Sequence, residues 1–325
     1  MITMNLQTNV SIPKPEGPLL NYDSSIFLLG SCFSRNIGDQ LNYFKFKSAQ
    51  NPFGILFHPM AIENLIQKSM EEYSYSEKDI DLKNEVFFSF DAHSNLNGLD
   101  KQSVISNLNE ALAKTRNLIM EASHIFITLG TAWVYRHLNT DKIVANCHKV
   151  PQKEFQKELL SVREIKDSLL NIIQLIQSVS PNCKIIFTVS PIRHVKNGLA
   201  ANNRSKSHLI AAVHEVVDMQ EQASYFPSYE IQMDELRDYR FYDEDLIHPN
   251  KIAIQYIWER FQECWIDPSM KSILNEVDSI QKGLHHKTFN ENSKAHQDFK
   301  LKLEQRIKDL QKRFSHIHFS PAITA

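Results

Sequence analysis

Three short, mainly apolar runs, separated by long segments, constrain the fold of this chain most strongly. They are Ile26–Gly30, His124–Gly130 and Lys184–Pro191. Strands that are apolar on both faces are typical of a parallel sheet covered by helices on both sides. The first run ends in glycine and the third in proline, residues that end regular structure. The sequence therefore predicts an α/β fold built on a doubly wound parallel sheet, in which ligand chemistry collects beyond the carboxyl ends of the strands.

Helices are expected between these runs. After the first run, Ile37, Leu41 and Phe44 stand at i, i+4 and i+7, and Ser34 is available as a cap. Other helical stretches are expected from about Val104 and over about Val162–Val179, Ser205–Met219 and Lys251–Cys264. The stretch 225–249 is dense in charged and aromatic residues and is expected to lie outside the core.

Changes in composition divide the chain into three parts. Three prolines, at positions 13, 15 and 18, predict an irregular N-terminal arm over residues 1–19. Residues 20–268 carry the α/β pattern and form the predicted main domain. Residues 269–325 are polar with sparse apolar positions, so we expect a helical extension of one or two amphipathic helices. These helices either pack on the domain or form a homodimer.

Charge and cysteine usage limit the partners and the compartment. The 325 residues include 36 Lys plus Arg and 38 Asp plus Glu, a net charge of −2. This balance gives no electrostatic reason to expect nucleic acid or a membrane as a partner. The first residues lack the pattern of a signal peptide, and no apolar run is long enough for a membrane span. The four cysteines form no C-x-x-C pair, which favours reduced thiols and a cytoplasmic protein.

Three polar residues match the requirements of nucleophilic catalysis. Ser31 directly follows Gly30 at the end of the first apolar run, where the free N–H groups of the next helix can face developing negative charge. Asp245 and His248 are three residues apart, so one turn can place the carboxylate on imidazole Nδ1 while Nε2 faces the serine. The sequence therefore predicts Ser31 as nucleophile, His248 as base and Asp245 as the group that orients it.

Several segments also resemble the GSCFA domain family. The run LGSCFSRNIG (29–38) looks like its signature, with Ser34 where the family name has alanine. Further segments that look like those of the family cover about residues 20–265: NPFGILFHP (51–59), SFDAHS (89–94), TLGTAWVY (128–135), VANCHKVP (144–151), TVSPIRH (188–194), YFPSYEIQMDELRDYRFY (225–242) and DLIHPN (245–250).

The GSCFA domain is similar to SGNH (GDSL-like) hydrolases, which implies a three-layer α/β/α sandwich and the deacylation of esters without a cofactor. In those enzymes a glycine N–H and an asparagine side chain help to form the oxyanion hole. The similarity places Gly54 at the glycine, but Ala132 stands where the asparagine is expected. The predicted oxyanion donors are therefore Ser31, Gly54 and, in place of the asparagine, Asn51 or Thr131.

Two other chemistries remain open at this stage. Cys32 adjoins Ser31 and is an alternative nucleophile, because thiol pKa values fall near a helix N-terminus. His93, His148 and His194 with Asp91 are a candidate metal site, but no closely spaced histidine pair supports it, and no metal is predicted.

Substrate contacts are expected from Arg193, His194, Trp133 and His93. A fixed guanidinium such as that of Arg193 suits an anionic or sugar-linked group. Structural ion pairs are an equal possibility for the cations Arg193, Lys149 and Lys206 with the acids Glu230, Asp234 and Glu235. Aromatic residues beyond the strand ends form either a stacking wall for a carbohydrate or part of the core: Trp133, Tyr135, Tyr225, Phe226, Tyr229, Tyr239, Phe241 and Tyr242.

The leading hypothesis is therefore a serine esterase that removes an acetyl or other short acyl group from a glycan or a small metabolite. Acyl transfer would use the same residues. The alternative is a catalytically silent carbohydrate-binding or scaffolding protein, which the alanine at position 132 motivates.

Overall fold

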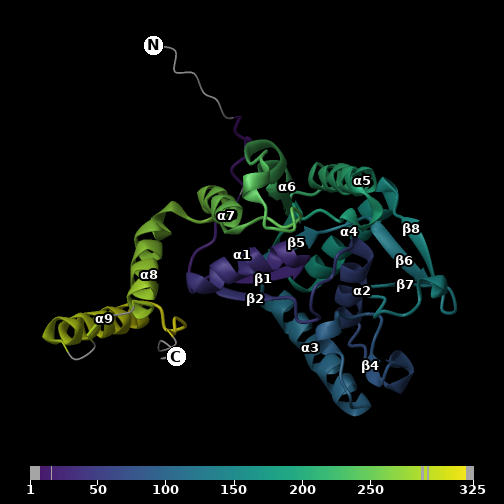
Figure 1. The fold of residues 1–325 in the computed structure, drawn as a ribbon, viewed down its shortest axis with the longest axis horizontal. Helices are drawn as coiled ribbons and strands as arrows, with labels where there is room; N and C mark the ends of the chain where they lie inside the picture. The colour runs from purple at the N-terminus through teal and green to yellow at the C-terminus, as the bar shows by residue number, and fades with distance from the viewer. Residues whose placement is uncertain (1–7, 16, 287–288, 291–292, 320–325) are drawn as a thin grey trace, which may run out of the picture.

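The computed structural model describes residues 8–15, 17–286, 289–290 and 293–319, so the predicted arm and extension lie partly outside the described residues. Within these ranges the chain is centred on a five-stranded, all-parallel sheet in the order β10-β9-β5-β1-β2 (Figure 1). Its strands are β1 (Ser25–Gly30), β2 (Lys47–Gln50), β5 (His124–Leu129), β9 (Lys184–Val189) and β10 (Ala223–Tyr225).

The three central strands are the three apolar runs, and both of their faces are buried. In β1, Phe27 and Leu29 belong to one hydrophobic core, whereas Ile26 and Leu28 belong to the other. Successive side chains of a strand point to opposite faces, so an unbroken apolar run can supply two cores at once. The α/β prediction is confirmed.

Helices cover both faces of the sheet, which gives three layers (Figure 1). Apolar residues of α2, α3, α4 and α5 share one core, and those of α1 and α7 share the other. The helices of this domain are α1 (Cys32–Tyr43), α2 (Pro59–Met70), α3 (Lys101–Glu121), α4 (Val162–Val179), α5 (Leu199–Val217), the short α6 (Ser228–Glu230) and α7 (Lys251–Trp265).

Two local expectations were wrong. Ser34 does not cap α1: the N-cap is Ser31, and the Ser34 hydroxyl donates to the Ser31 carbonyl at 2.7 Å. The stretch 225–249 is not wholly outside the core, since Phe226, Ile231 and Leu236 are buried in the core under α7. The sequence did not reveal the burial of these three residues, because their neighbours are polar and their burial depends on packing against α7, which comes later in the chain.

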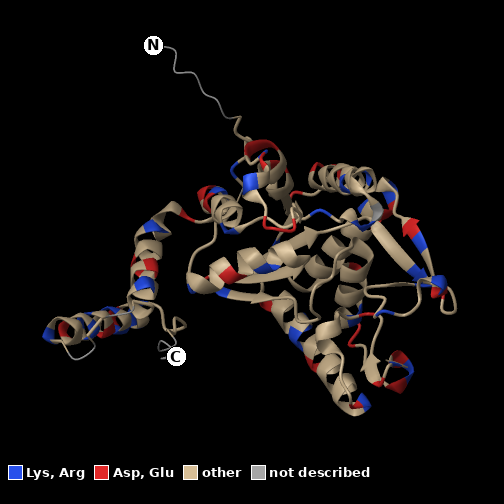
Figure 2. Cartoon of the chain, in the orientation of Figure 1, with Lys and Arg blue, Asp and Glu red and all other residues tan. Residues whose placement is uncertain are grey.

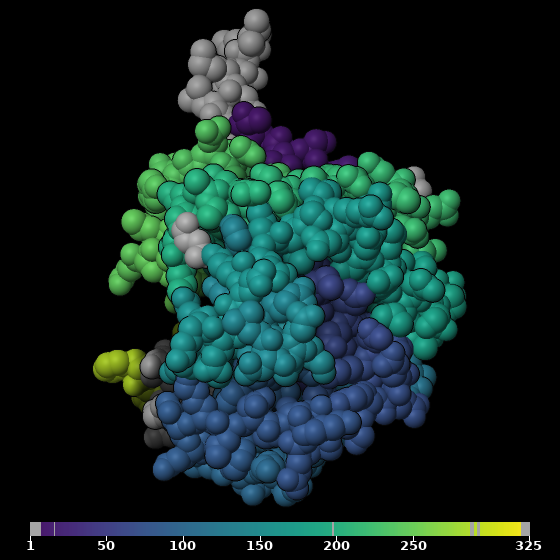
Figure 3. Space-filling view, turned by 90° about the vertical axis from the view of Figure 1, so that its right-hand side faces the viewer, coloured from purple at the N-terminus to yellow at the C-terminus, as the bar shows by residue number. Residues whose placement is uncertain are grey.

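Two small sheets lie at one end of the domain. In sequence, a β3–β4 hairpin lies between α2 and α3, and an antiparallel sheet of order β7-β6-β8 lies between β5 and α4. Figure 3 faces this end, where the teal residues of the small sheet lie above the blue residues that precede them. These strands are β3 (Asp81–Lys83), β4 (Val86–Phe88), β6 (Trp133–His137), β7 (Lys142–Val144) and β8 (Phe155–Leu159).

The C-terminal extension forms two helices, α8 (Lys271–Leu284) and α9 (Lys294–Arg313), which reach out to one side of the sheet (Figure 1). Ile273, Val277 and Ile280 of α8 are buried and join the core that contains α1 and α7. The expected amphipathic helices are therefore present, and α8 packs on the domain. A homodimer formed through these helices stays a prediction.

Charges of both signs are dispersed over the helices, including α8 and α9, while the central sheet carries few (Figure 2). This mixing agrees with the near-zero net charge of the sequence. Across the described part of the chain, no helix combines the length and the apolar character needed to cross a membrane.

The domain boundary can be tested by truncation after residue 268. The shortened chain keeps the whole five-stranded sheet and α1–α7, so we expect a folded domain with cooperative unfolding. It loses the apolar contacts of α8, so its melting temperature should be lower than that of the full chain. Thermal unfolding followed by circular dichroism measures both effects. A broad, non-cooperative transition would show that α8 and α9 are needed to complete the core.

Candidate functional site

Ser31 sits in a tight turn between β1 and α1 at the carboxyl end of the central sheet. Gly30 adopts φ 125°, in the region that favours glycine, and a Cβ added there would lie 2.1 Å from the Thr128 carbonyl oxygen. The close approach allows the Ser31 N–H to donate to that same oxygen at 3.0 Å. Neighbouring β5 therefore fixes the backbone that presents the serine.

The Ser31 hydroxyl is buried and has no hydrogen-bond partner among the described residues. Although Ser31 is the N-cap of α1, its side chain makes no cap hydrogen bond. The N–H groups of Cys32 and Phe33 lie in the first turn, where the helix offers no acceptor of its own. An unpartnered buried hydroxyl costs stability, so its presence beside free helix N–H groups is typical of a functional position.

Asn51 holds this turn in place. Its Oδ1 accepts from the Gly30 N–H at 2.9 Å, and its Nδ2 donates to the Ser34 hydroxyl at 3.0 Å. Asn51 itself has φ 43°, a conformation that asparagine tolerates better than most residues. Asn51, which follows β2, therefore stabilises the turn that carries Ser31.

The other predicted oxyanion donors also have partners. The Gly54 N–H donates to the Asn51 carbonyl at 2.8 Å, and the Thr131 N–H donates to the Phe57 carbonyl at 3.1 Å. The Thr131 hydroxyl lies 3.0 Å from that of Ser205. The oxyanion role of Ser31, Gly54, Asn51 and Thr131 stays a prediction. In this structure the N–H groups of Ser31, Gly54 and Thr131 and the side-chain amide of Asn51 all have internal hydrogen bonds.

Asp245 and His248 form the expected pair. Asp245 Oδ2 lies 2.6 Å from His248 Nδ1, while its Oδ1 accepts the N–H groups of Ile247 and His248 at 2.9 Å each. The hydrogen bond from the His248 backbone, together with that from its ring, lowers the pKa of Asp245 to about 2. The carboxylate is therefore ionised at any ordinary pH and fixes the orientation of the imidazole.

His194 lies beside Ser31. A Cβ added to Gly130 would be 3.3 Å from both His194 Nε2 and Ser31 Cβ, so these two atoms are separated by at most twice that distance. Burial, followed by the charges of Lys206 and His248, lowers the pKa of His194 to about 4. His194 is therefore a neutral imidazole at pH 7.

Lys206 of α5 is buried beneath this region. Its ammonium donates to the carbonyls of Gly130 at 2.7 Å and Ser190 at 2.6 Å, which follow β5 and β9. Burial lowers the pKa of Lys206 to about 7. The lysine joins the carboxyl ends of two strands. The sequence offered Lys206 as a possible ion-pair partner and gave no signal of this role.

The residues predicted to touch substrate separate into two groups. Arg193 and His194 follow β9: the His194 ring lies near Ser31, and Arg193 donates to the Tyr242 hydroxyl at 2.9 Å. Trp133 instead donates through Nε1 to the Ala201 carbonyl at 3.1 Å, with the Lys157 ammonium 4.2 Å from its ring. His93 packs against Gly54, where a Cβ would lie 2.4 Å from that of His93.

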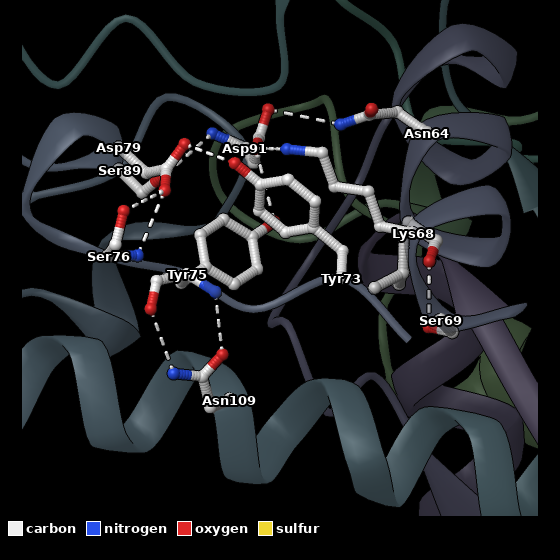
Figure 4. Close-up of polar contacts among 11 residues, drawn as sticks. Asn64, Lys68, Ser69, Tyr73, Tyr75, Ser76, Asp79, Ser89, Asp91 and Asn109 are labelled. Carbon is white, nitrogen blue, oxygen red and sulfur yellow. Dashed lines mark hydrogen bonds and ion pairs between the residues drawn. The ribbon is translucent and has the colours of Figure 1, made fainter. Parts of the chain in front are cut away.

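The residues of the candidate metal site are engaged elsewhere. His148 Nε2 lies 2.9 Å from the Ser89 carbonyl. Asp91 binds Lys68, Asn64 and Tyr75 in a polar cluster between α2 and the following loops (Figure 4). Within the ranges that the structure describes, no group of three or more His, Cys, Asp or Glu could hold a metal ion.

The structure also bears on two alternatives from the sequence: structural ion pairs for the cations, and Cys32 as the nucleophile. Neither Arg193 nor Lys206 forms an ion pair within the described residues, since Glu235 binds Arg260 and Glu230 accepts from Tyr225. Burial raises the pKa of the Cys32 thiol, although its own helix turn and Arg35 act in the opposite direction. A raised pKa disfavours the thiolate that a cysteine nucleophile needs.

Comparison with known proteins identifies related families. The model described as the GSCFA family matches residues 25–261, and one described as GSCFA domain protein, C-terminal domain, matches residues 277–325. A search of curated proteins finds no match. A solved structure from Streptococcus pneumonia, described under the name of a platelet activating factor, is 15% identical over 78% of this chain and 85% of that chain, with a TM-score of 0.37. At that identity and TM-score, the likeness carries no argument about activity.

Proposed function

Because the chain belongs to the GSCFA family, whose model spans it from β1 into α7, we propose that it is a serine esterase with SGNH-like chemistry. The substrate is an acyl ester, most simply an acetylated glycan or a small acylated metabolite. The observation that most supports this proposal is the Ser31 hydroxyl at the start of α1, which is buried and has no hydrogen-bond partner among the described residues. The four free cysteines support a cytoplasmic location.

In the proposed reaction, Ser31 Oγ attacks the ester carbonyl carbon and its proton passes to His248 Nε2. Collapse of the tetrahedral intermediate breaks the bond to the leaving alcohol, which takes that proton from His248. Water then attacks the acyl-enzyme with His248 again as base, which releases the carboxylic acid and restores Ser31. Asp245 stabilises the imidazolium that forms in each half-reaction.

We assign the oxyanion hole to the free N–H groups at the start of α1, which the position of Ser31 suggested, and to the His194 ring, which the sequence offered only as a substrate contact. The first-turn N–H groups of Cys32 and Phe33 lack helix acceptors, and His194 is neutral at pH 7, so its ring can donate a hydrogen bond. His194 lies near Ser31, where Ala132 offers no side-chain donor. These groups would replace the missing asparagine of the SGNH pattern, where one donor typically contributes roughly 10²- to 10³-fold in rate.

A silent carbohydrate-binding protein is the second candidate. The observation that favours it is that the N–H groups of Ser31, Gly54 and Thr131 and the side-chain amide of Asn51 already have internal hydrogen bonds. The two candidates differ in turnover, since only the esterase hydrolyses an activated ester through Ser31.

The pH dependence of ester hydrolysis tests the proposed base. With Asp245→Asn, we expect kcat/KM for p-nitrophenyl acetate to fall by roughly 10²- to 10⁴-fold. The acid limb of the profile should move to lower pH, because an ionised Asp245 favours the imidazolium and asparagine does not. Rates of purified protein measured from pH 4 to 9 give both effects.

Glu244→Gln is the matched control, since it removes one exposed negative charge from the same loop. It should leave the rate and the acid limb close to those of the wild type. An acid limb that is the same in wild type, Asp245→Asn and His248→Ala would show that His248 is not the base, and His194 would then be tested. No hydrolysis by the wild type of either p-nitrophenyl acetate or acetylated glycans would favour the silent protein.

A further inference from the structure

A cavity of about 200 Å³ lies beside the proposed catalytic site, between the residues that follow β9 and the segment from Gln232 to Tyr242. Arg193 lines it, and the next residue, His194, adjoins Ser31. Tyr242 also lines it and forms an isolated β-bridge with Pro249, directly after His248. The volume corresponds to roughly seven waters, which suits a polar portion of a larger substrate.

Gln232 lines this cavity and carries a side-chain amide without a hydrogen-bond partner among the described residues. Its side chain is completely buried, and neither its amide nitrogen nor its amide oxygen has a partner among the described residues. It lies in a π-helical turn, Ile231–Glu235, a conformation that is rare and frequent at functional sites. A buried amide without partners costs stability, so a ligand that supplies both a donor and an acceptor would satisfy it.

Arg193 contributes a fixed positive charge. Its guanidinium carbon lies 4.5 Å from the centre of the Tyr242 ring, and its NH2 nitrogen donates to the Tyr242 hydroxyl at 2.9 Å. No carboxylate pairs with it in the part of the chain that the structure describes. The stacked guanidinium is therefore oriented, and N–H groups remain available for a planar anion.

The balance of charge around the cavity is positive. Arg237 also lines it, and the one acidic residue among its lining, Asp238, accepts from the Arg240 N–H at 2.9 Å and lies 3.8 Å from the Arg240 side chain. The carboxylate of Asp238 is thus partly neutralised.

We propose that this cavity is a subsite for a carboxylate flanked by a hydroxyl group, as found in uronic acids and in 2-hydroxy acids. Arg193 binds the carboxylate, and the Gln232 amide binds the carboxylate and the neighbouring hydroxyl. This subsite rests on the proposed function, because its ligand is taken to be the part of the ester substrate next to the bond that Ser31 cleaves. The subsite then narrows the substrate class to acyl esters of acidic sugars or hydroxy acids.

Direct binding to the Ser31→Ala protein tests the subsite without any turnover. We expect calorimetry to detect D-glucuronate, with D-glucose and inorganic phosphate binding at least about tenfold more weakly. L-Lactate, a free hydroxy acid, distinguishes the two sources: binding as tight as that of glucuronate assigns the subsite to the acid group alone, and weaker binding assigns it to an acidic sugar. Either result supports the shared chemistry.

Variants identify the residues responsible. Arg193→Gln and Gln232→Leu should each weaken glucuronate binding at least about tenfold, whereas Arg163→Gln, an equal charge change on exposed α4, should not alter it. Gln232→Leu should melt no lower than its parent, because the amide it removes is unpartnered. If it does not fold, Gln232→Met, which is similar in length and carries no amide, replaces it and should weaken binding to the same extent.

Three results would overturn the subsite: glucose binding as tightly as glucuronate, phosphate binding in place of glucuronate, or unchanged binding in Arg193→Gln. None of them bears on whether Ser31 hydrolyses p-nitrophenyl acetate. Conversely, glucuronate binding that depends on Arg193 in a protein without esterase activity would support the subsite and refute the proposed reaction.

Discussion

Replacing Ser31 with alanine is expected to lower kcat for p-nitrophenyl acetate by roughly 10⁴- to 10⁶-fold, because the covalent route is lost with the nucleophile. The same substitution should leave the melting temperature unchanged or slightly higher. The Ser31 hydroxyl is buried and makes no hydrogen bond among the described residues, so alanine removes a polar group that contributes nothing to the fold. Loss of activity without loss of stability is the signature of a catalytic hydroxyl.

Two further measurements separate serine from cysteine chemistry. A fluorophosphonate probe should add to the wild-type peptide that contains Ser31 and not to Ser31→Ala. Cys32→Ala keeps the backbone N–H, so the rate of this variant should fall by less than about tenfold. A small change of that size reflects altered packing, whereas loss of the nucleophile gives a far larger one. A Ser31→Ala protein that keeps most of its activity while Cys32→Ala loses it would identify the thiol as the nucleophile.

Gly30→Ala is expected to lower the free energy of unfolding by about 3 to 5 kcal/mol, which combines backbone strain with overpacking. Gly30 has φ 125°, and an added Cβ would lie 2.1 Å from the Thr128 carbonyl oxygen and 2.8 Å from its nitrogen. These atoms belong to the hydrogen-bonded backbone of β5 and cannot move without breaking the pairing of β1 with β5. Urea unfolding measures the change.

Gly198→Ala is the matched control for Gly30. It also has positive φ, 86°, but an added Cβ would meet nothing within 4 Å. Its cost should therefore be backbone strain alone, about 1 to 2 kcal/mol. Equal losses in the two variants would mean that the contact between Gly30 and Thr128 is not as close as the structure shows.

Features that depend on neighbouring residues could be predicted from the sequence. The apolar runs identified β1, β5 and β9, and the helix expected over about Val162–Val179 has the bounds of α4 in the structure. The pairing of Asp245 with His248 also follows from a three-residue spacing that one turn closes. These features are local because strand alternation, helix caps and tight turns are set within a few residues.

Only the tertiary structure decided which distant residues meet at the site. Asn51, expected as an oxyanion donor, braces the turn at Gly30, and His194 lies beside Ser31 although 163 positions separate them in the sequence. The burial of Gln232 within a polar stretch depends in the same way on packing against α7. A sequence pattern records the face that a residue presents, whereas sheet order and helix packing determine what that face contacts, because those contacts form between segments far apart in the chain.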